Sequence, residues 1–415
     1  MRFSGIVISI AIVFMIIAGV AVDAADEPPI PAPSQSKVTE ASDDFGLRIL
    51  KVLSPQAEKE NLIISPISLA SALAMTYNGA AGKTKTAMAA TLGISSLSDK
   101  ELNAGYKSEL SGLKSADKAV QLDIANAIWP GVPLQKSFQN ITLEYYSATA
   151  KDLNFRDAKG AAHTINGWCD KNTHGKIPEI VSPGELNEFT ALVLTNAVYF
   201  KGEWSRAFEA KQTKPRDFYL PNGEVKKTPM MAKSGDYDYL QTDDFQAVRL
   251  PYGSGRLGMY VFLPRNRDSK AAPQFLNSLD SKHWIEWTGQ MRPTPGEVVL
   301  PKFEVRWGAK MNDALASMGM GVAFSDGADF SRIPQNRTPL KITAVEHKTY
   351  MKLDEKGTEA AAATAVVVGV VSSALVHPHP EPFEMIIDHP FFLAITDRKT
   401  GAMLFAGVIC DPTSE

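Results

Sequence analysis

The chain has 415 residues, of which 44% are hydrophobic and 21% charged, a globular composition that excludes wholesale disorder. Lys and Arg number 43 against 46 Asp and Glu, and a net charge of −3 argues against nucleic acid as a partner, because phosphate-binding surfaces need a basic excess. Only two cysteines occur, Cys169 and Cys410, which excludes a disulfide framework or a cysteine-rich zinc module; we expect both thiols to be free.

The N-terminal segment has the pattern of an export signal. Arg2 precedes an apolar run from Gly5 to Val22, and Val22-Asp23-Ala24 is a small-residue cleavage site. The alternative is a membrane anchor, since this 18-residue run, rich in Ile and Val, is just long enough to span a bilayer. We predict a signal peptide over 1–24, no stable membrane association after its removal, and a secreted protein, periplasmic if the source is bacterial.

The remainder is expected to form one domain. Residues 25–40 are proline-rich and predict a flexible lead, and no linker or repeat interrupts residues 41–413. Apolar spacing and cap residues predict three helices. The first begins near Ser42, with Phe45, Ile49, Val52 and Leu53 on its inward face. The second begins at Ser65-Pro66 and stops near Gly79. The third runs from near His163 to His174, with Ile165, Trp168 and Cys169 inward.

Strands are predicted mainly in the second half of the chain. Apolar runs predict them at 191–200, 257–263, 297–300, 391–396 and 403–409, the last two as a hairpin. Because helices cluster early and strands late, the pattern favours an α+β fold over the alternation of a doubly wound fold.

Several possible sites do not survive inspection. Residues 79–84 resemble a phosphate loop, but the spacing between the glycines is too short and a helix precedes it. His377-Pro378-His379 lacks companion ligands, so no metal site is predicted. Cys169 lies on the apolar side of its helix and is expected to be a packed thiol. We therefore expect no cofactor and no enzyme activity.

The segment from Glu355 to Val371 has an unusual pattern. Its first half is alanine, a weak strand former, and its second half is valine, which disfavours a helix. With period two, one face carries no charge, whereas Glu359 lies on the other face. Slim, uncharged side chains without proline are what a strand needs to slide between two existing strands. The members of the uncharged face are Thr358, Ala360, Ala362, Thr364, Val366, Val368 and Val370.

Five motifs, in the right order, are similar to those of the serpin family. The segment from Glu355 to Thr364 resembles the hinge of inhibitory serpins, and 388–392 resembles the family's C-terminal signature. The others are 61–68, 195–204 and 300–303. The resemblance implies three β-sheets, about nine helices and an exposed reactive-centre loop, here within 355–390.

The resemblance also implies a suicide mechanism. A serine protease attacks the loop and forms an acyl-enzyme. The cut loop then inserts as a new strand and carries the protease to the opposite pole, where its active site is distorted. The implied partner is a serine protease, and the chain is expected to be a monomer.

Counting from Glu355 as the family does, the scissile bond is Val371–Ser372. Valine before the bond suits an elastase-like pocket. The stretch from Ser372 to Phe391 is longer than in most relatives, so Leu375–Val376, for a chymotrypsin-like protease, stays open as the alternative.

Other family positions lie elsewhere in the chain. The resemblance assigns Ser65, Ser68, Asn196 and His347 to a shutter beneath the opening of the central sheet, and Trp204, Lys302 and Glu355 to a breach where the loop enters it. Asn196 lies in an apolar run and needs a hydrogen-bond partner, for which His347 is the candidate. We also expect a Lys302–Glu355 ion pair. The hinge comprises Glu355, Gly357, Thr358, Glu359, Ala360, Ala361, Ala362, Ala363 and Thr364.

The alternative function is a non-inhibitory member of the family, a ligand carrier or chaperone. Such members tend to have bulky or charged residues or proline in the hinge. Residues 360–364 have none, which favours inhibition.

Overall fold

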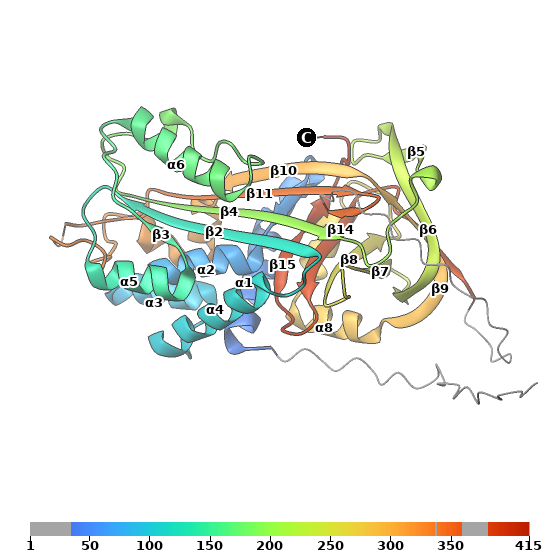
Figure 1. Cartoon of the computed structure of the whole chain (residues 1–415), viewed down its shortest axis with the longest axis horizontal. Coiled ribbons are helices and arrows are strands. Elements are labelled where there is room, and N and C mark those ends of the chain that lie inside the picture. Colours follow the sequence, from blue (N-terminus) through green and yellow to red (C-terminus); the bar gives the residue numbers. More distant parts are fainter. Residues whose placement is uncertain (1–34, 337, 359–380, 415) are drawn as a thin grey trace, which may run out of the picture. The chain divides into compact units, whose positions relative to one another are not determined.

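The computed structural model describes residues 35–336, 338–358 and 381–414. Its helices and strands are mixed as in an α+β protein, which confirms the predicted class (Figure 1). The nine described α-helices are α1 (Lys37–Leu53), α2 (Pro66–Tyr77), α3 (Gly82–Leu92), α4 (Asp99–Lys114), α5 (Lys136–Tyr146), α6 (Ala158–Asn172), α7 (Ala271–Ser278), α8 (Ser281–Gln290) and α9 (Asn312–Leu315).

Fifteen strands are described. They are β1 (Leu62–Ile64), β2 (Val120–Pro130), β3 (Thr149–Ala150), β4 (Leu192–Glu203), β5 (Lys214–Tyr219), β6 (Val225–Gln241), β7 (Phe245–Pro251), β8 (Leu257–Pro264), β9 (Arg292–Pro301), β10 (Phe303–Lys310), β11 (Ala344–Asp354), β12 (Gly357–Thr358), β13 (Phe383–Ile386), β14 (Phe391–Asp397) and β15 (Met403–Ile409). Short helical turns lie at Ser54–Glu58, Pro183–Glu185, Ala210–Gln212, Ala316–Met320 and Gly321–Phe324.

Hydrogen bonds join the described strands into two networks. One has six strands in the order β10-β11-β12-β4-β2-β3, and we call it the central sheet. The other has nine strands in the order β1-β15-β14-β8-β7-β6-β9-β13, with β5 on β6. The nine-stranded network is continuous because the long strand β6 pairs with β5 at its start and with β7 at its end. The resemblance implies three sheets, whereas the described strands form two separate networks, each of them continuous.

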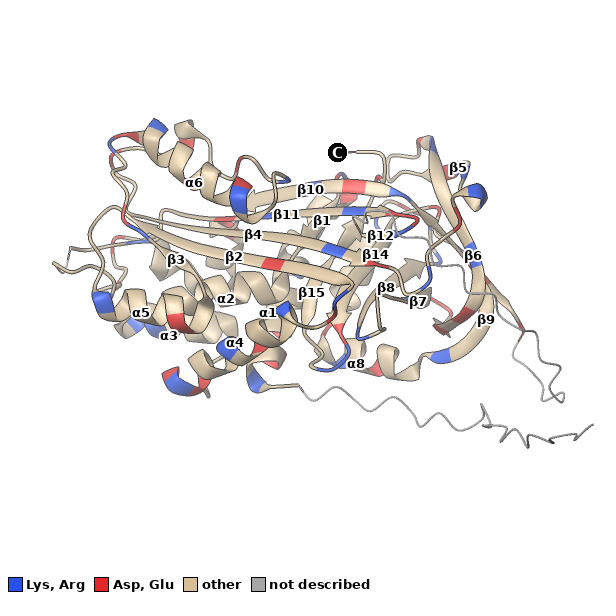
Figure 2. Ribbon diagram, viewed as in Figure 1, with Lys and Arg blue, Asp and Glu red and all other residues tan. Residues whose placement is uncertain are grey.

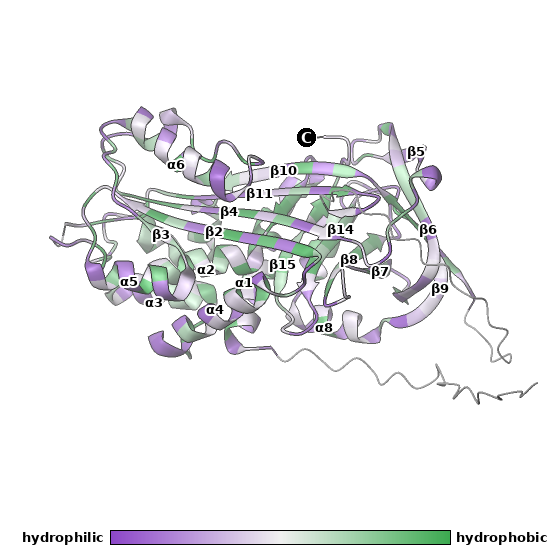
Figure 3. Cartoon of the chain, in the orientation of Figure 1, coloured by the Kyte–Doolittle hydropathy of each residue, from purple (hydrophilic) through white to green (hydrophobic). Residues whose placement is uncertain are grey.

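Helices cover both faces of the central sheet. α2 contacts β2 and β4 from below in Figure 1, and α6 contacts the same two strands from above. α2 is buried along its whole length and is mostly apolar, as Figure 3 shows, so it belongs to the core rather than to the surface. The central sheet is thus held between a buried helix and a surface helix.

The predicted elements are found with shifted ends. The first helix begins at Lys37, five residues before the expected start, because the Ser36 hydroxyl accepts the Thr39 N–H. Val52, expected inward, is 40% exposed, since it lies off the buried stripe of α1. The second helix ends at Tyr77, and the third spans Ala158–Asn172.

The C-terminal hairpin, the two cysteines and the distribution of charge can be compared with the expectations from the sequence. The C-terminal hairpin forms as predicted, with Phe391 opposite Ile409. Cys169 and Cys410 are both free and buried, and burial raises the pKa of each thiol to about 12. Figure 2 shows acidic and basic residues interspersed over the sheets and helices. Among the described residues no helix is long and apolar enough to cross a bilayer; the segment 1–24 lies outside them.

Candidate functional site: the opening of the central sheet

The central sheet is closed along part of its length and open at one end. β4 and β11 pair in parallel from Val193–Ala344 to Tyr199–Tyr350. Beyond that point the two strands separate, and β12 lies between them, antiparallel to both. Figure 2 labels β12 at the right-hand end of the sheet. The chain that leads into the expected reactive-centre loop therefore begins as a two-residue strand inside the sheet.

β12 fits only because its first residue is glycine. Gly357 has φ +150°, and a Cβ there would lie 2.0 Å from the carbonyl oxygen of Gly202. Thr358 follows, fully buried, with its hydroxyl 2.7 Å from that of Tyr252. The Tyr252 ring stacks on Trp204 with a centroid distance of 4.5 Å. The inward face of β12 is therefore the face that carries Thr358.

The predicted breach residues meet around this point. Lys302 Nζ lies 2.8 Å from Glu355 Oε2, so the expected ion pair is present in the structure. Thr213 donates its hydroxyl to the other carboxylate oxygen at 2.8 Å. Burial alone would raise the pKa of Glu355, but the hydrogen bonds from Lys302 and Thr213 outweigh it and lower that pKa. Trp204 donates its indole N–H to the Asp354 carbonyl at 3.0 Å. These contacts hold Asp354 and Glu355, where the chain turns toward β12.

The predicted shutter residues also meet, beneath the closed part of the sheet. His347 is fully buried, and its Nε2 accepts the backbone N–H of Ser65 at 3.1 Å. The ring proton is therefore on Nδ1 and is donated to Asn196 Oδ1. Burial lowers the pKa of His347 to about 3, so the imidazole is neutral.

Asn196 connects three strands and α2. Its side-chain amide donates to Ser68 Oγ and to Asn126 Oδ1, and Asn126 donates to Ser71 Oγ at 2.8 Å. Asn126, Asn196 and His347 lie opposite one another on β2, β4 and β11. A strand inserted between β4 and β11 has to break the Asn196–His347 bond. The hydroxyl of Ser65, by contrast, is buried without a hydrogen-bond partner in the described part of the chain.

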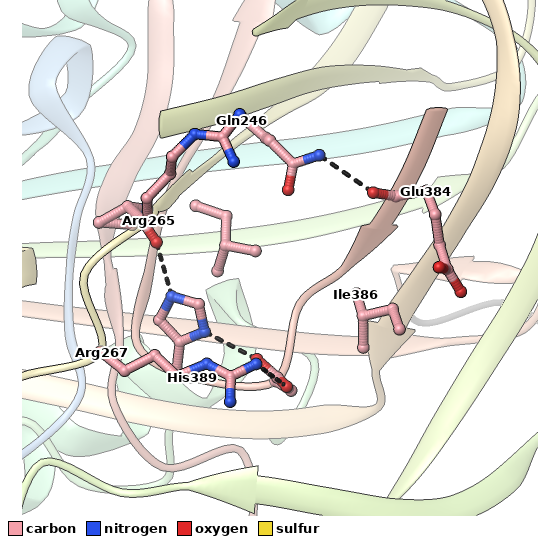
Figure 4. A pocket seen from close by; sticks show the side chains of 9 residues that line it. Gln246, Arg265, Arg267, Glu384, Ile386 and His389 are labelled. Carbon is pink, nitrogen blue, oxygen red and sulfur yellow. Dashed lines mark hydrogen bonds and ion pairs between the residues drawn. The ribbon is translucent and has the colours of Figure 1, made fainter. Parts of the chain in front are cut away.

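The chain leaves the loop region through β13. The rings of Phe383 and Tyr239 stack with a centroid distance of 3.7 Å. Gln246 donates its side-chain amide to the Glu384 carbonyl at 3.0 Å, as Figure 4 shows. An open pocket of about 240 Å³ lies beside β13. Asp388, just after β13, pairs with Arg267 at 2.7 Å. Both flanks of the loop region are therefore anchored, one in each sheet network.

Some functional residues were missed, and others lie outside the described residues. Asn126 gives the same signal as Asn196, an amide in an apolar run, whereas nothing in the sequence around Tyr252 indicates its bond to Thr358. Among the described residues no group of His, Cys, Asp or Glu is arranged to hold a metal ion. The part of the site outside the described residues comprises Glu359, Ala360, Ala361, Ala362, Ala363, Thr364, Val371, Ser372, Leu375 and Val376.

Comparison with known proteins gives one consistent result. The family model described as serpin (serine protease inhibitor) matches residues 40–412. An uncharacterized serpin-like protein of Thermococcus kodakarensis is 37% identical over 91% of this chain and 86% of its own. Serpin B6 of Pongo abelii is 34% identical over 90% of this chain and 99% of its own. The structure of human thyroxine-binding globulin with its ligand matches with a TM-score of 0.82 and 25% identity, over 91% of this chain and 99% of that one. The chain therefore belongs to the serpin family.

Proposed function

We propose that this chain is a suicide inhibitor of serine proteases, which it traps by cleavage and insertion of its reactive-centre loop. The observation that carries the proposal is the position of Gly357 and Thr358 between β4 and β11. The loop sequence continues directly from these residues, so insertion lengthens a strand that has already begun. The family is one of protease inhibitors in general; the mechanism and the target class are our proposals.

The faces of the loop sequence agree with this direction of insertion. Thr358 points inward, toward Tyr252. Because side chains alternate along a strand, residues 360, 362, 364, 366, 368 and 370 would face the same way. This is the uncharged face of the sequence, and Glu359 would point outward. The inserted strand would then bury small side chains and no charge, as a strand over a packed core requires.

The scissile bond and the target follow from the sequence. We propose cleavage at Val371–Ser372 by an elastase-like protease, with Leu375–Val376 and a chymotrypsin-like protease as the alternative. We further propose that residues 1–24 direct export, that the mature chain is a monomer, and that it acts outside the cell or in the periplasm. It would turn over no substrate, since each encounter consumes the loop.

The test is incubation of the mature chain with elastase, with chymotrypsin and trypsin alongside. The proposal predicts a complex that survives denaturing electrophoresis, and a released fragment whose intact mass corresponds to a start at Ser372. A fragment that starts at Val376 would favour the alternative bond. Cleavage without a complex would contradict inhibition and favour a carrier; thyroxine-binding globulin, a structural neighbour, was crystallised with thyroxine.

A further inference from the structure

We propose that the open pocket beside β13 binds a small organic anion, with its phosphate or carboxylate group at Arg265 and Arg267 and its apolar part on Leu263 and Ile386. The pocket has a volume of about 240 Å³. Its lining comes from β7, from the end of β8 and the residues that follow it, and from β13 and the residues after it (Figure 4). The inference goes beyond the proposed function, because it concerns the uncleaved chain and no protease takes part.

Arg265 is held beside the pocket by the turn between β6 and β7. Its backbone N–H donates to the Asp244 carbonyl at 2.8 Å, and its side-chain Nε donates to the Thr242 carbonyl at 2.9 Å. The bond from Nε leaves the two terminal nitrogens of the guanidinium without a partner in the described part of the chain. A guanidinium that is already oriented loses little freedom when it binds an anion, so these two nitrogens are suited to that role.

Arg267 is oriented by two other contacts. One of its terminal nitrogens lies 2.7 Å from Asp388 Oδ2, and its guanidinium carbon lies 4.8 Å from the centroid of the Tyr219 ring. The side chain is still 53% exposed, so a ligand can reach its remaining N–H groups. Arg265 and Arg267 thus bring two guanidinium groups to one pocket, and phosphate and carboxylate groups accept charge-assisted hydrogen bonds from such groups.

The acidic residues of the lining do not cancel this positive charge. Asp388 receives Arg267 on one carboxylate oxygen, and its other oxygen lies 2.7 Å from Nδ1 of the buried His389. His389 Nε2 lies 2.6 Å from the Pro264 carbonyl oxygen. Because a carboxylate and a carbonyl only accept, both ring nitrogens donate and the ring is an imidazolium. Figure 4 shows the Glu384 side chain extending away from His389. Three positive groups and two carboxylates therefore line the pocket, a balance that favours an anion.

The volume and the apolar lining determine the size of the ligand. Leu263 and Pro264 are buried, and Ile386 is half-buried. The volume of about 240 Å³ exceeds the roughly 150 Å³ of a cavity that holds benzene. One ring and one anionic group therefore fit, whereas a bare inorganic ion would leave the apolar lining without a contact. The occupant is thus a phosphate monoester or a carboxylate that carries a single ring.

An occupant of the pocket would join β8 to β13. Among the described strands β13 pairs only with β9. A ligand bound to Arg265, which follows β8, and to Ile386 in β13 would add a second attachment. Binding should therefore hold β13 more firmly in the nine-stranded network, since a ligand stabilises the state to which it binds.

The test is calorimetric titration of the mature, uncleaved chain with phenyl phosphate and, separately, with inorganic phosphate. The variants are Arg265→Gln and Ile386→Ser. Arg156→Gln, at an exposed arginine in the turn before α6, is the matched control for the loss of one positive charge. Thermal unfolding without ligand checks that each variant is folded.

We expect saturable binding of phenyl phosphate at one site, and about tenfold weaker binding of inorganic phosphate because the ring is missing. Arg265→Gln should weaken phenyl phosphate about tenfold, and Arg156→Gln should not. Ile386→Ser should weaken phenyl phosphate and leave inorganic phosphate unchanged. The absence of saturable binding, equal affinities of Arg265→Gln and Arg156→Gln, or equal affinities for the two probes would each overturn the proposal.

Amide hydrogen exchange provides a second measurement. Saturating phenyl phosphate should slow exchange in β13 of the unmodified chain and leave it unchanged in Arg265→Gln at the same concentration. Equal exchange in β13 with and without phenyl phosphate would contradict the attachment of β13 by the ligand. Because neither measurement involves a protease, failure here leaves the proposed inhibition intact, and failure of inhibition leaves this site intact.

Discussion

The hydroxyl groups of Tyr252 and Thr358 lie 2.7 Å apart, and both side chains are fully buried. Tyr252 follows β7, in the nine-stranded network, whereas Thr358 ends β12, in the central sheet. The bond therefore ties the last residue of β12 to a residue that follows a strand of the other network. If the loop inserts as proposed, we expect its initial insertion to depend on this contact.

Replacing Tyr252 by Phe should loosen the hinge. The substitution leaves the buried Thr358 hydroxyl without its partner, at a cost of about 1–3 kcal/mol. β12 should then leave the sheet more often, and amide hydrogen exchange at Thr358 should become about 5- to 150-fold faster. Tyr219→Phe, at a partly exposed tyrosine, is the control. Unchanged exchange at Thr358 would show that the bond does not hold the hinge.

Replacing Gly357 by Ala should prevent β12 from forming. The added Cβ would lie 2.0 Å from the Gly202 carbonyl oxygen, at a backbone conformation that alanine avoids. Insertion should slow, so that the protease completes hydrolysis more often and more inhibitor is consumed for each protease trapped. Gly167→Ala in α6, where a Cβ meets nothing within 4 Å, should leave this ratio unchanged. Equal ratios for both variants would contradict the role of Gly357.

The Lys302–Glu355 pair should show weak coupling. Lys302 is 36% exposed and Glu355 16%, so we expect a small but measurable coupling of about 0.2–1 kcal/mol in a double-mutant cycle. The variants are Lys302→Met, Glu355→Gln and both together, compared through unfolding rates in denaturant. The exposed Lys227–Asp217 pair is the control and should couple less. Coupling indistinguishable from zero at Lys302–Glu355 would remove the pair from the account.

The sequence predicts a contact where a buried polar side chain must have a hydrogen-bond partner, or where two residues match known family positions. Asn196 in an apolar run needed a partner, and the structure supplies His347. The Lys302–Glu355 pair followed from matched family positions. Tyr252 could not be assigned, because its partner Thr358 is 106 residues away and no periodicity links them. The start of α1 was missed because the Ser36 cap lies inside a stretch whose composition indicates a flexible lead.

Acid should weaken the shutter through His347. Burial lowers its pKa to about 3, whereas the unfolded chain takes up the proton near the ordinary pKa of about 6.5. Its contribution is therefore complete above pH 6.5 and falls as the pH drops toward 3, by about 2 kcal/mol between pH 6.5 and 5. Spontaneous loss of inhibitory activity should accelerate over this range.

His347→Gln should flatten this acid dependence, since glutamine does not titrate. His163→Gln, at an exposed histidine of α6, is the control and should retain the dependence of the unmodified chain. The rate of activity loss is measured from pH 7 to pH 4.5 for all three proteins. Parallel profiles for His347→Gln and the unmodified chain would show that another group is responsible.

Glu346, next to His347 on β11, should act in the opposite direction. Burial, with the nearby Glu185 carboxylate, raises the pKa of Glu346 to about 7 although Lys310 and Lys348 partly offset it. Stability from Glu346 is present at acid pH and is lost as the pH rises from about 4.5 through 7. Glu346→Gln should therefore stabilise the fold at pH 8 and have little effect at pH 4.5, as measured by thermal unfolding. Destabilisation at pH 8 would contradict this account.

If the proposed function is right, the cleaved loop becomes a strand of the central sheet. Thermal unfolding of the chain before and after cleavage at Val371–Ser372, followed by circular dichroism, tests this. Because insertion adds a strand that pairs with both β4 and β11, we predict a large rise in Tm on cleavage. An unchanged or lower Tm, with cleavage verified by the mass of the fragment that begins at Ser372, would contradict the account.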